Sequence, residues 1–173
     1  MLLLVLTAGI TGSSYACTCI GKDKQTTESE FSSSKLVVKG KIIASSDYLY
    51  YDTLITVFTG IPFDRATSGY MIRQYKIYTL VVESRFKSDK GLADTLRIVT
   101  GYGNGDCGYE FETGKDYIVY ANAWTEKKLI IKQRKKKIKK KIREEPVTNW
   151  FYTDICRLTQ ESNQLELDKI KNL

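Results

Sequence analysis

The sequence contains no histidine and little proline. The absence of histidine excludes the largest number of catalytic and metal-binding mechanisms. Among 173 residues there are two prolines and no histidine. Without histidine the chain cannot form a histidine general base, a Cys–His or Ser–His nucleophile pair, or a histidine metal site. Hydrophobic residues make up 42% of the chain, which is typical of a folded domain. We therefore expect a folded domain that is not an enzyme.

Acidic side chains cluster in the sequence around a glycine-rich segment, where a carboxylate pair or a calcium site could form. These residues are Asp94, Asp106, Glu110, Glu112 and Asp116. Their spacing does not match a calcium-binding loop of the EF-hand type, and acids in surface turns are common. A catalytic carboxylate pair is the least favoured interpretation. We expect no cofactor and no metal of the protein's own.

An apolar segment precedes the first cysteine. Residues 1–16 are rich in leucine and end at Ala16 in the small-x-Ala pattern that a signal peptidase cleaves. The segment is too short for a membrane-spanning helix. We expect a signal peptide over residues 1–16 and one extracytoplasmic domain over residues 17–173, with Cys17 as its first residue. A lipid attached to Cys17 is a second interpretation, and only this one predicts a membrane association.

Positive charge is concentrated in one stretch. Residues 127–143 carry eleven basic side chains and no acidic one, whereas the formal net charge of the chain is +7, so the other residues sum to −4. We interpret the stretch as a basic insertion that forms a solvated loop or a frayed hairpin extension. A nucleic-acid ligand is not favoured, because the basic residues do not spread over the chain. A polyanion is a possible ligand for six lysines of this stretch: Lys135, Lys136, Lys137, Lys139, Lys140 and Lys141.

The pattern of apolar residues predicts five strands. Period-two alternation marks the first strand, and β-branched and aromatic residues mark the others. The predicted strands cover residues 35–43, 72–83, 96–100, 116–121 and 129–132. Five strands without intervening helices indicate an all-β fold, a small five-stranded antiparallel β-barrel.

Three other segments complete the predicted organisation. Polar residues 22–34 predict an extended leader over the surface, and residues 47–70 predict a long excursion between the first two strands. Thr159 predicts the N-cap of one C-terminal helix, because apolar residues follow it at near-helical spacing.

A glycine-rich segment over residues 101–108 contains the pattern G-x-G-x-x-G from Gly103 to Gly108. The dinucleotide-binding fingerprint needs a helix directly after these glycines, whereas a strand is predicted here. We interpret the segment as a turn that presents Cys107 for a disulfide.

Four cysteines in an exported chain favour two disulfides over a zinc site, and no C-x-x-C pair is present. Cys17 and Cys19 lie one residue apart, so in an extended segment they point to opposite faces and are poorly placed to bond each other. Each is well placed to reach a separate partner, and the partners available are Cys107 and Cys156. The sequence leaves three pairings open, with Cys17–Cys19 the least favoured.

Several motifs together resemble the netrin-like module typified by the tissue inhibitors of metalloproteinases, most closely its single-domain bacterial relatives. In chain order the motifs are Ala16-Cys17-Thr18-Cys19, Val37-Val38-Lys39-Gly40-Lys41, Asp106-Cys107-Gly108-Tyr109, Gly114-Lys115-Asp116-Tyr117 and Ile155-Cys156. The resemblance covers nearly all of the expected mature chain. It implies a barrel of the OB type, with disulfides Cys17–Cys107 and Cys19–Cys156.

The resemblance also implies a function. In the inhibitors, the amine and carbonyl oxygen of the mature N-terminal cysteine chelate the catalytic zinc of a target protease, and the next side chain enters its specificity pocket. Carried over, Cys17 is the chelator and Thr18 the pocket residue, and the protein's partner is a zinc metalloprotease. Two alternatives stay open: an extracytoplasmic interaction module that inhibits nothing, and a polyanion binder that uses the basic stretch.

Overall fold

The computed structural model describes residues 19, 21–55, 68–103, 105–134 and 137–173. The expected signal peptide, Cys17 and Thr18 lie outside the described residues.

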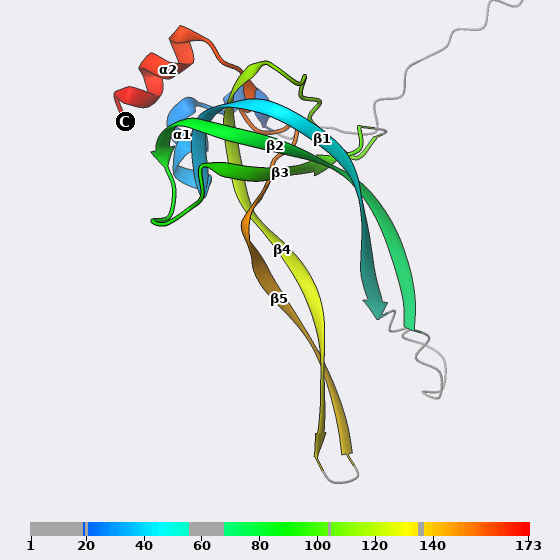
Figure 1. Ribbon diagram of the computed structural model, residues 1–173. Coiled ribbons are helices and arrows are strands. Elements are labelled where there is room, and N and C mark those ends of the chain that lie inside the picture. Colours follow the sequence, from blue (N-terminus) through cyan, green and yellow to red (C-terminus); the bar gives the residue numbers. More distant parts are fainter. Residues whose placement is uncertain (1–18, 20, 56–67, 104, 135–136) are drawn as a thin grey trace, which may run out of the picture.

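Five long strands form a closed ring (Figure 1). They are β1 (Leu36–Ile55), β2 (Ser68–Lys87), β3 (Thr95–Gly101), β4 (Asp116–Arg134) and β5 (Lys137–Tyr152). Neighbours follow the order β1-β2-β3-β5-β4, and pairing of β4 with β1 closes the ring. The two-residue strand β6 (Gln160–Glu161) pairs with the start of β4. The prediction of a mostly β fold is therefore confirmed.

The prediction of antiparallel pairing throughout is wrong at one place. β3 and β5 run parallel, with Ile98 opposite Phe151, whereas the other ring pairings are antiparallel. A closed ring with an odd number of strands cannot reverse direction at every step, so five strands require at least one parallel pair. The long β4–β5 hairpin meets this requirement, because it returns the chain to the ring beside β3 and in the direction of β3.

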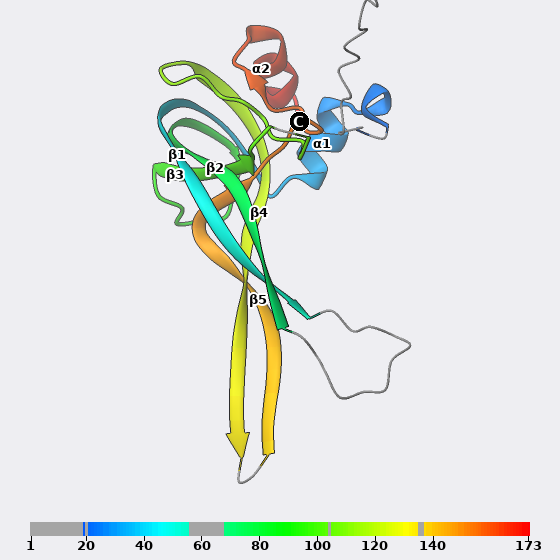
Figure 2. The same cartoon turned by 90° about the vertical axis from the view of Figure 1, so that its right-hand side faces the viewer.

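The hairpin of β1 and β2 extends well beyond the ring (Figure 2), and its strands are longer than predicted. Its register runs from Val37 opposite Lys87 to Ile55 opposite Ser68. The predicted excursion over residues 47–70 is therefore wrong at both ends, where the two strands continue. Backbone pairing across the hairpin supports this continuation where the apolar pattern alone had suggested a break. Residues 56–67 lie outside the described residues.

The β4–β5 hairpin is the second long projection. β4 is one strand that contains both predicted strands over residues 116–121 and 129–132. β5 runs through the basic stretch, so the loop interpretation of that stretch is wrong and the hairpin interpretation describes it. Cross-strand pairing runs from Asn122 opposite Tyr152 to Arg134 opposite Lys137. It gives the backbone groups of the basic stretch their hydrogen-bond partners, which a pattern of charged side chains does not reveal.

Alternating residues of the strands fill the interior of the ring. On β1, Leu36, Val38 and Ile42 are fully buried there. Leu80, Leu96, Ile98, Val119 and Phe151 from the other strands belong to the same core. Val37 lies on the opposite face of β1 and is also fully buried, because the helices cover that face.

Helix α1 (Thr27–Ser33) corrects the predicted extended leader over residues 22–34, and a short 3₁₀ helix, Lys22–Lys24, precedes it. Thr26 and Ser29 form a capping box in which each hydroxyl accepts a hydrogen bond from the other residue's backbone N–H. Phe31 packs against Val37 and its neighbours. The helix was missed because its buried side, which includes Thr27 and Glu30, is largely polar.

Helix α2 (Gln164–Lys171) is the predicted C-terminal helix, but it begins later than expected. Its N-cap is Asn163, whose side-chain oxygen accepts a hydrogen bond of 2.9 Å from the backbone N–H of Glu166. Thr159 is not the N-cap. Its hydroxyl lies 2.8 Å from that of Thr153 and bonds the backbone of Tyr120, so the sheet and not the helix uses it.

Aromatic side chains join the bases of the two hairpins. The Tyr48 hydroxyl donates to the Glu126 carboxylate over 2.7 Å, and the backbone N–H of Lys127 donates to the Tyr50 hydroxyl over 2.9 Å. Trp124 is 7% exposed and packs edge-on against Tyr50 and other rings. These contacts connect β1 with β4 beyond the point where their backbones pair.

Candidate functional site

The segment next to the predicted zinc-chelating residue is bonded to the body of the domain. Cys19 forms a disulfide with Cys156, and their Cα atoms lie 5.2 Å apart. This is the pairing that the resemblance implied. Cys17 and Thr18 lie outside the described residues, so their roles stay predictions, as does the Cys17–Cys107 bond. Cys107 is itself disulfide-bonded.

The glycine-rich loop over residues 101–108 holds Cys107 in a defined position. The Asp106 carboxylate accepts hydrogen bonds from the backbone N–H groups of Tyr102, Gly103 and Gly108, at 2.6, 2.8 and 3.3 Å. Cys107 has a φ of 61°, in the left-handed region that residues with a side chain rarely adopt. The loop is therefore fixed by Asp106. The sequence analysis groups this residue with other acids, although an aspartate among glycines is a general turn signal, because its side chain can accept a hydrogen bond from the backbone N–H two residues on.

Two glycines of the loop pack backbone against backbone. A Cβ atom on Gly108 would lie 2.1 Å from the carbonyl oxygen of Gly101, and one on Gly101 would lie 2.6 Å from the Asp106 side chain. No side chain fits at either position without moving the main chain. This close approach gives Gly101 and Gly108 a structural reason to be glycine.

The two cysteines on the body of the domain belong to neighbouring segments. The backbone N–H of Ile155 donates to the carbonyl oxygen of Cys107 over 2.9 Å. The ammonium group of Lys22 donates to the carbonyl oxygen of Ile155 over 2.7 Å. We call residues 101–103, 105–108 and 154–157 the anchor platform. Cys107 and Cys156, which the resemblance pairs with cysteines of the N-terminal segment, both lie on this platform.

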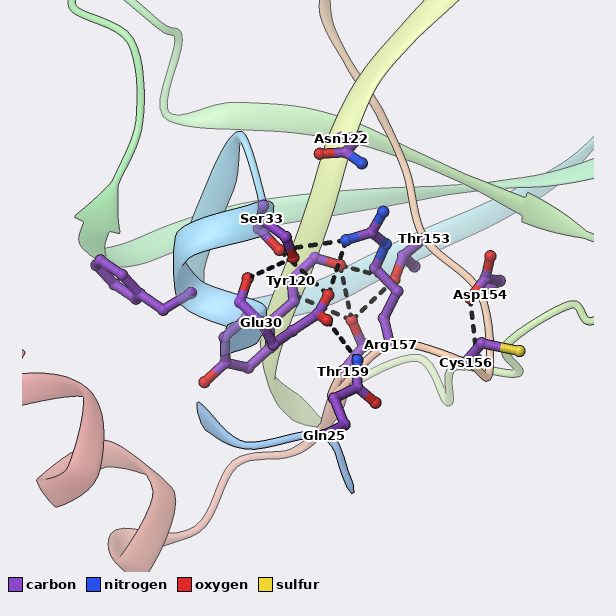
Figure 3. A network of polar contacts seen from close by, with 12 residues as sticks. Gln25, Glu30, Ser33, Tyr120, Asn122, Thr153, Asp154, Cys156, Arg157 and Thr159 are labelled. Carbon is purple, nitrogen blue, oxygen red and sulfur yellow. Dashed lines mark hydrogen bonds and ion pairs between the residues drawn. The ribbon is translucent and has the colours of Figure 1, made fainter. Parts of the chain in front are cut away.

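A partly buried ion pair joins the platform to helix α1 (Figure 3). The Arg157 guanidinium contacts the Glu30 carboxylate over 2.7 Å, with 21% and 6% of their side chains exposed. Ser34 and Gln25 also donate hydrogen bonds to this carboxylate. The pair therefore joins the residue after Cys156 to helix α1. The two residues are 127 positions apart, and no local sequence signal marks either one.

A second buried carboxylate joins both helices to the sheet. Glu166 accepts hydrogen bonds from the Tyr120 hydroxyl at 2.6 Å and the Thr27 hydroxyl at 3.1 Å. Burial, together with this bond to a carboxylate, raises the pKa of Tyr120 well above its ordinary value. The helices are thus held over the ring by polar as well as apolar contacts. This arrangement fixes the position of α1, on which the Arg157 ion pair depends.

An open polar cavity of about 360 Å³ lies beside the disulfide. Its lining includes Cys19, Lys22, Gln25, Glu30 and Cys156. The side-chain oxygen of Gln25 is buried and accepts no hydrogen bond from the described residues. The cavity has the polar character of a contact surface for peptide groups and lacks the apolar lining of a small-molecule site.

The acids around the glycine loop do not form a joint site. Asp94 pairs with Arg85 at 2.8 Å and Glu112 with Lys115 at 3.0 Å. Glu110 and Asp116 lie within 3.8 and 3.4 Å of Lys76 and Lys41. These four acids therefore each have a separate basic partner, and the fifth, Asp106, is bonded to the backbone of the loop. In the part of the chain that the structure describes, no cluster of three or more Asp, Glu, Cys or His residues could hold a metal.

The lysines predicted to bind polyanions lie near the tip of the β4–β5 hairpin. Lys135 and Lys136 are outside the described residues. In β5, Lys137 and Lys139 lie opposite Arg134 and Lys132, whereas Lys140 and Lys141 lie opposite Ile131 and Ile130. The hairpin thus places basic residues directly opposite one another, far from the anchor platform.

The fold and the platform define a class: a small β domain with a closed ring of strands and an N-terminal segment held by a disulfide. No model of a protein family matches the chain, and a search of curated proteins found no similar sequence. Among the described residues, no helix has the length and apolar character needed to cross a membrane.

Proposed function

We propose that this protein is an extracytoplasmic inhibitor of zinc metalloproteases, built on a netrin-like module with a fold of the OB type. A closed ring in the order β1-β2-β3-β5-β4, a C-terminal helix and a disulfide from the N-terminal segment support this proposal. Disulfides are typical of exported proteins, which supports the extracytoplasmic location.

The anchor platform is the observation that carries the proposal. Cys19 is bonded to Cys156, and the segment of Cys156 is hydrogen-bonded to Cys107. With the proposed Cys17–Cys107 bond, Thr18 lies between two cross-linked residues. A segment held on both sides of the contact residue loses little conformational freedom when it binds, so more of the contact energy becomes affinity.

The proposed chemistry needs only the N-terminus of the mature chain. An α-amino group has an ordinary pKa of about 8, so a useful fraction is neutral at pH 7 and able to coordinate zinc. The amine and carbonyl oxygen of Cys17 then take the open position of the target's zinc, where the catalytic water binds. Thr18 enters the adjoining specificity pocket. The mechanism requires no general base, which is compatible with a chain that lacks histidine.

The first test is the chemical state of the exported protein's N-terminus, by intact mass and N-terminal sequencing. The proposal predicts Cys17 as the first residue, with a free amine. An acylated Cys17 would overturn the proposal, because an amide nitrogen does not coordinate zinc in this way. A chain that begins elsewhere would overturn it too.

The second test is Thr18→Gly, assayed against a panel of zinc metalloproteases with Thr18→Ser as the conservative control. We expect the glycine variant to lose at least about tenfold in affinity, since a pocket contact is worth roughly 1 to 3 kcal/mol. Unchanged inhibition by Thr18→Gly would refute the role of Thr18. A free Cys17 without inhibition of any protease would indicate the alternative, a module that binds other proteins.

A further inference from the structure

The far part of the β4–β5 hairpin is a two-stranded ribbon. After Ala121, β4 pairs only with β5 among the described residues, and β5 pairs with β3 only over residues 150–152. Both views show that no other described element lies beside the distal half of the hairpin (Figures 1 and 2). We call residues 127–134 and 137–144 the basic ribbon.

The register divides the basic ribbon into two unlike faces. Residues directly opposite each other in an antiparallel pair lie on the same face, and the face changes at every step along a strand. One face holds seven basic residues and one isoleucine. Its cross-strand pairs are Lys128 with Arg143, Ile130 with Lys141, Lys132 with Lys139, and Arg134 with Lys137.

The other face holds most of the apolar residues of the ribbon. Its cross-strand pairs are Lys127 with Glu144, Leu129 with Ile142, Ile131 with Lys140, and Gln133 with Ile138. Four large aliphatic residues therefore share one face of a ribbon whose other face is almost entirely basic. The sequence alone does not show this division, because it depends on the register of the two strands.

Neither face of the ribbon stabilises the hairpin in water. Like charges directly opposite each other destabilise a pair of strands, and three of the four pairs on the basic face are of this kind. An isolated two-stranded hairpin is at best marginally stable, because its apolar face has no second layer to pack against. A ligand that stabilises both faces must therefore supply negative charge and an apolar environment.

We propose that the basic ribbon binds the surface of a bilayer with anionic headgroups. The face with Leu129 and Ile142 enters the boundary of the acyl chains, and the basic residues stay at the level of the phosphates. In a ribbon of two strands every residue is next to an open edge, and lysine stems in general are long enough to reach headgroups from there. A soluble polyanion satisfies only the basic face, and a second copy of the chain satisfies only the apolar face. Lipid attachment at Cys17 is not needed.

The test is flotation of the exported protein with vesicles of phosphatidylcholine alone or with 30% phosphatidylglycerol. We expect binding at least about tenfold tighter to the anionic vesicles, since each basic residue near such a surface contributes about fivefold. Lys132→Gln with Lys139→Gln should weaken this binding about tenfold or more, and Lys132→Arg with Lys139→Arg should leave it unchanged.

The apolar face is tested by Leu129→Thr with Ile142→Thr, which keeps the β propensity and the charge. Vesicle binding should fall at least about fivefold, while binding to dextran sulfate stays the same. Leu165→Thr is the control, because Leu165 is 69% exposed on α2, away from the ribbon. Absent vesicle binding would overturn the proposal, and vesicle binding that the apolar variant does not weaken would overturn it in favour of a polyanion site. A dimer in sedimentation velocity that the apolar variant dissociates would overturn it in favour of a second copy.

Discussion

The Arg157 guanidinium lies 2.7 Å from the Glu30 carboxylate and joins the residue after Cys156 to helix α1, across 127 positions of the chain. The carboxylate is only 6% exposed. The pair thus ties the anchor platform to helix α1, next to the cysteine that bonds the N-terminal segment to the domain. The N-terminal segment can be rigid only if the anchor platform to which it is bonded is itself stable.

Replacement of Arg157 by methionine should destabilise the domain by about 3 kcal/mol, because it leaves the Glu30 carboxylate buried without its partner. Arg157→Met combined with Glu30→Gln should recover much of this loss. The free energy of unfolding in urea, measured for both single variants and the double variant, gives the coupling between the two residues. A single variant within about 0.5 kcal/mol of wild type would show that the pair does not stabilise the platform.

Gly108→Ala should be far more damaging than Gly103→Ala, although both glycines lie in the same loop. A Cβ atom on Gly108 meets the Gly101 carbonyl oxygen at 2.1 Å, whereas one on Gly103 meets nothing within 4 Å. Gly103 has a φ of 96°, so alanine there brings only backbone strain, about 1 to 2 kcal/mol. We expect a loss above about 3 kcal/mol for Gly108→Ala, or no folded protein. Equal losses in thermal unfolding would contradict the close packing of the loop.

Removal of the Cys19–Cys156 bond by alanine at both positions should lower the free energy of unfolding by about 2 to 5 kcal/mol. The bond closes a segment of 137 residues, so it restricts the unfolded chain strongly. Denaturant unfolding under oxidising conditions measures the loss. Reduction of the wild-type protein, which opens every disulfide, should destabilise it at least as much. A double variant as stable as wild type would mean that the bond is not a structural anchor.

The Tyr120–Glu166 contact predicts a loss of stability at alkaline pH. Burial and the hydrogen bond to Glu166 raise the pKa of Tyr120 above its unfolded value of about 10. The folded state therefore holds this proton more tightly, and the resulting stabilisation is complete below pH 10 and declines as the pH rises above it.

Tyr120→Phe should cost roughly 1 to 3 kcal/mol at pH 7, where the hydrogen bond to the carboxylate is lost. Above pH 10 the difference from wild type should shrink by up to about 1.4 kcal/mol per pH unit, because only the wild-type protein loses the Tyr120 proton. Unfolding in urea from pH 7 to 11 measures both effects. Stability curves of the two proteins that stay parallel above pH 10 would show that another group controls the alkaline loss.

The sequence predicted the strands where apolar alternation is local and strong. The alternation of Leu36, Val38 and Ile42 places them inside the ring. Helix α1 was missed because its packing depends on Thr27 and Glu30, whose partners come from residues far along the chain. The region of β5 is expected only as a loop or a frayed hairpin extension, because the lysines that it carries do not indicate its backbone pairing. The parallel pairing of β3 with β5 follows from closure of the ring and not from either strand.

The candidate site shows the same division between local and distant signals. The cysteines can be recognised as disulfide partners from their number and spacing, and Asp106 could have been recognised from its place among the glycines of a turn. Arg157 has no such signal, because its partner is the Glu30 carboxylate and that residue lies on a helix that was not predicted. A backbone hydrogen bond joins the segments of Cys107 and Cys156, and no pattern of side chains encodes it.

The most direct test of the proposed inhibitor compares two forms of the protein against a panel of zinc metalloproteases. One form begins at Cys17 and the other carries a single additional alanine before it. The account predicts nanomolar to micromolar inhibition of at least one protease by the first form. The extended form should lose at least about a hundredfold, because its Cys17 nitrogen is an amide that cannot coordinate zinc as a free amine does. Equal inhibition by the two forms would contradict chelation by the Cys17 amine.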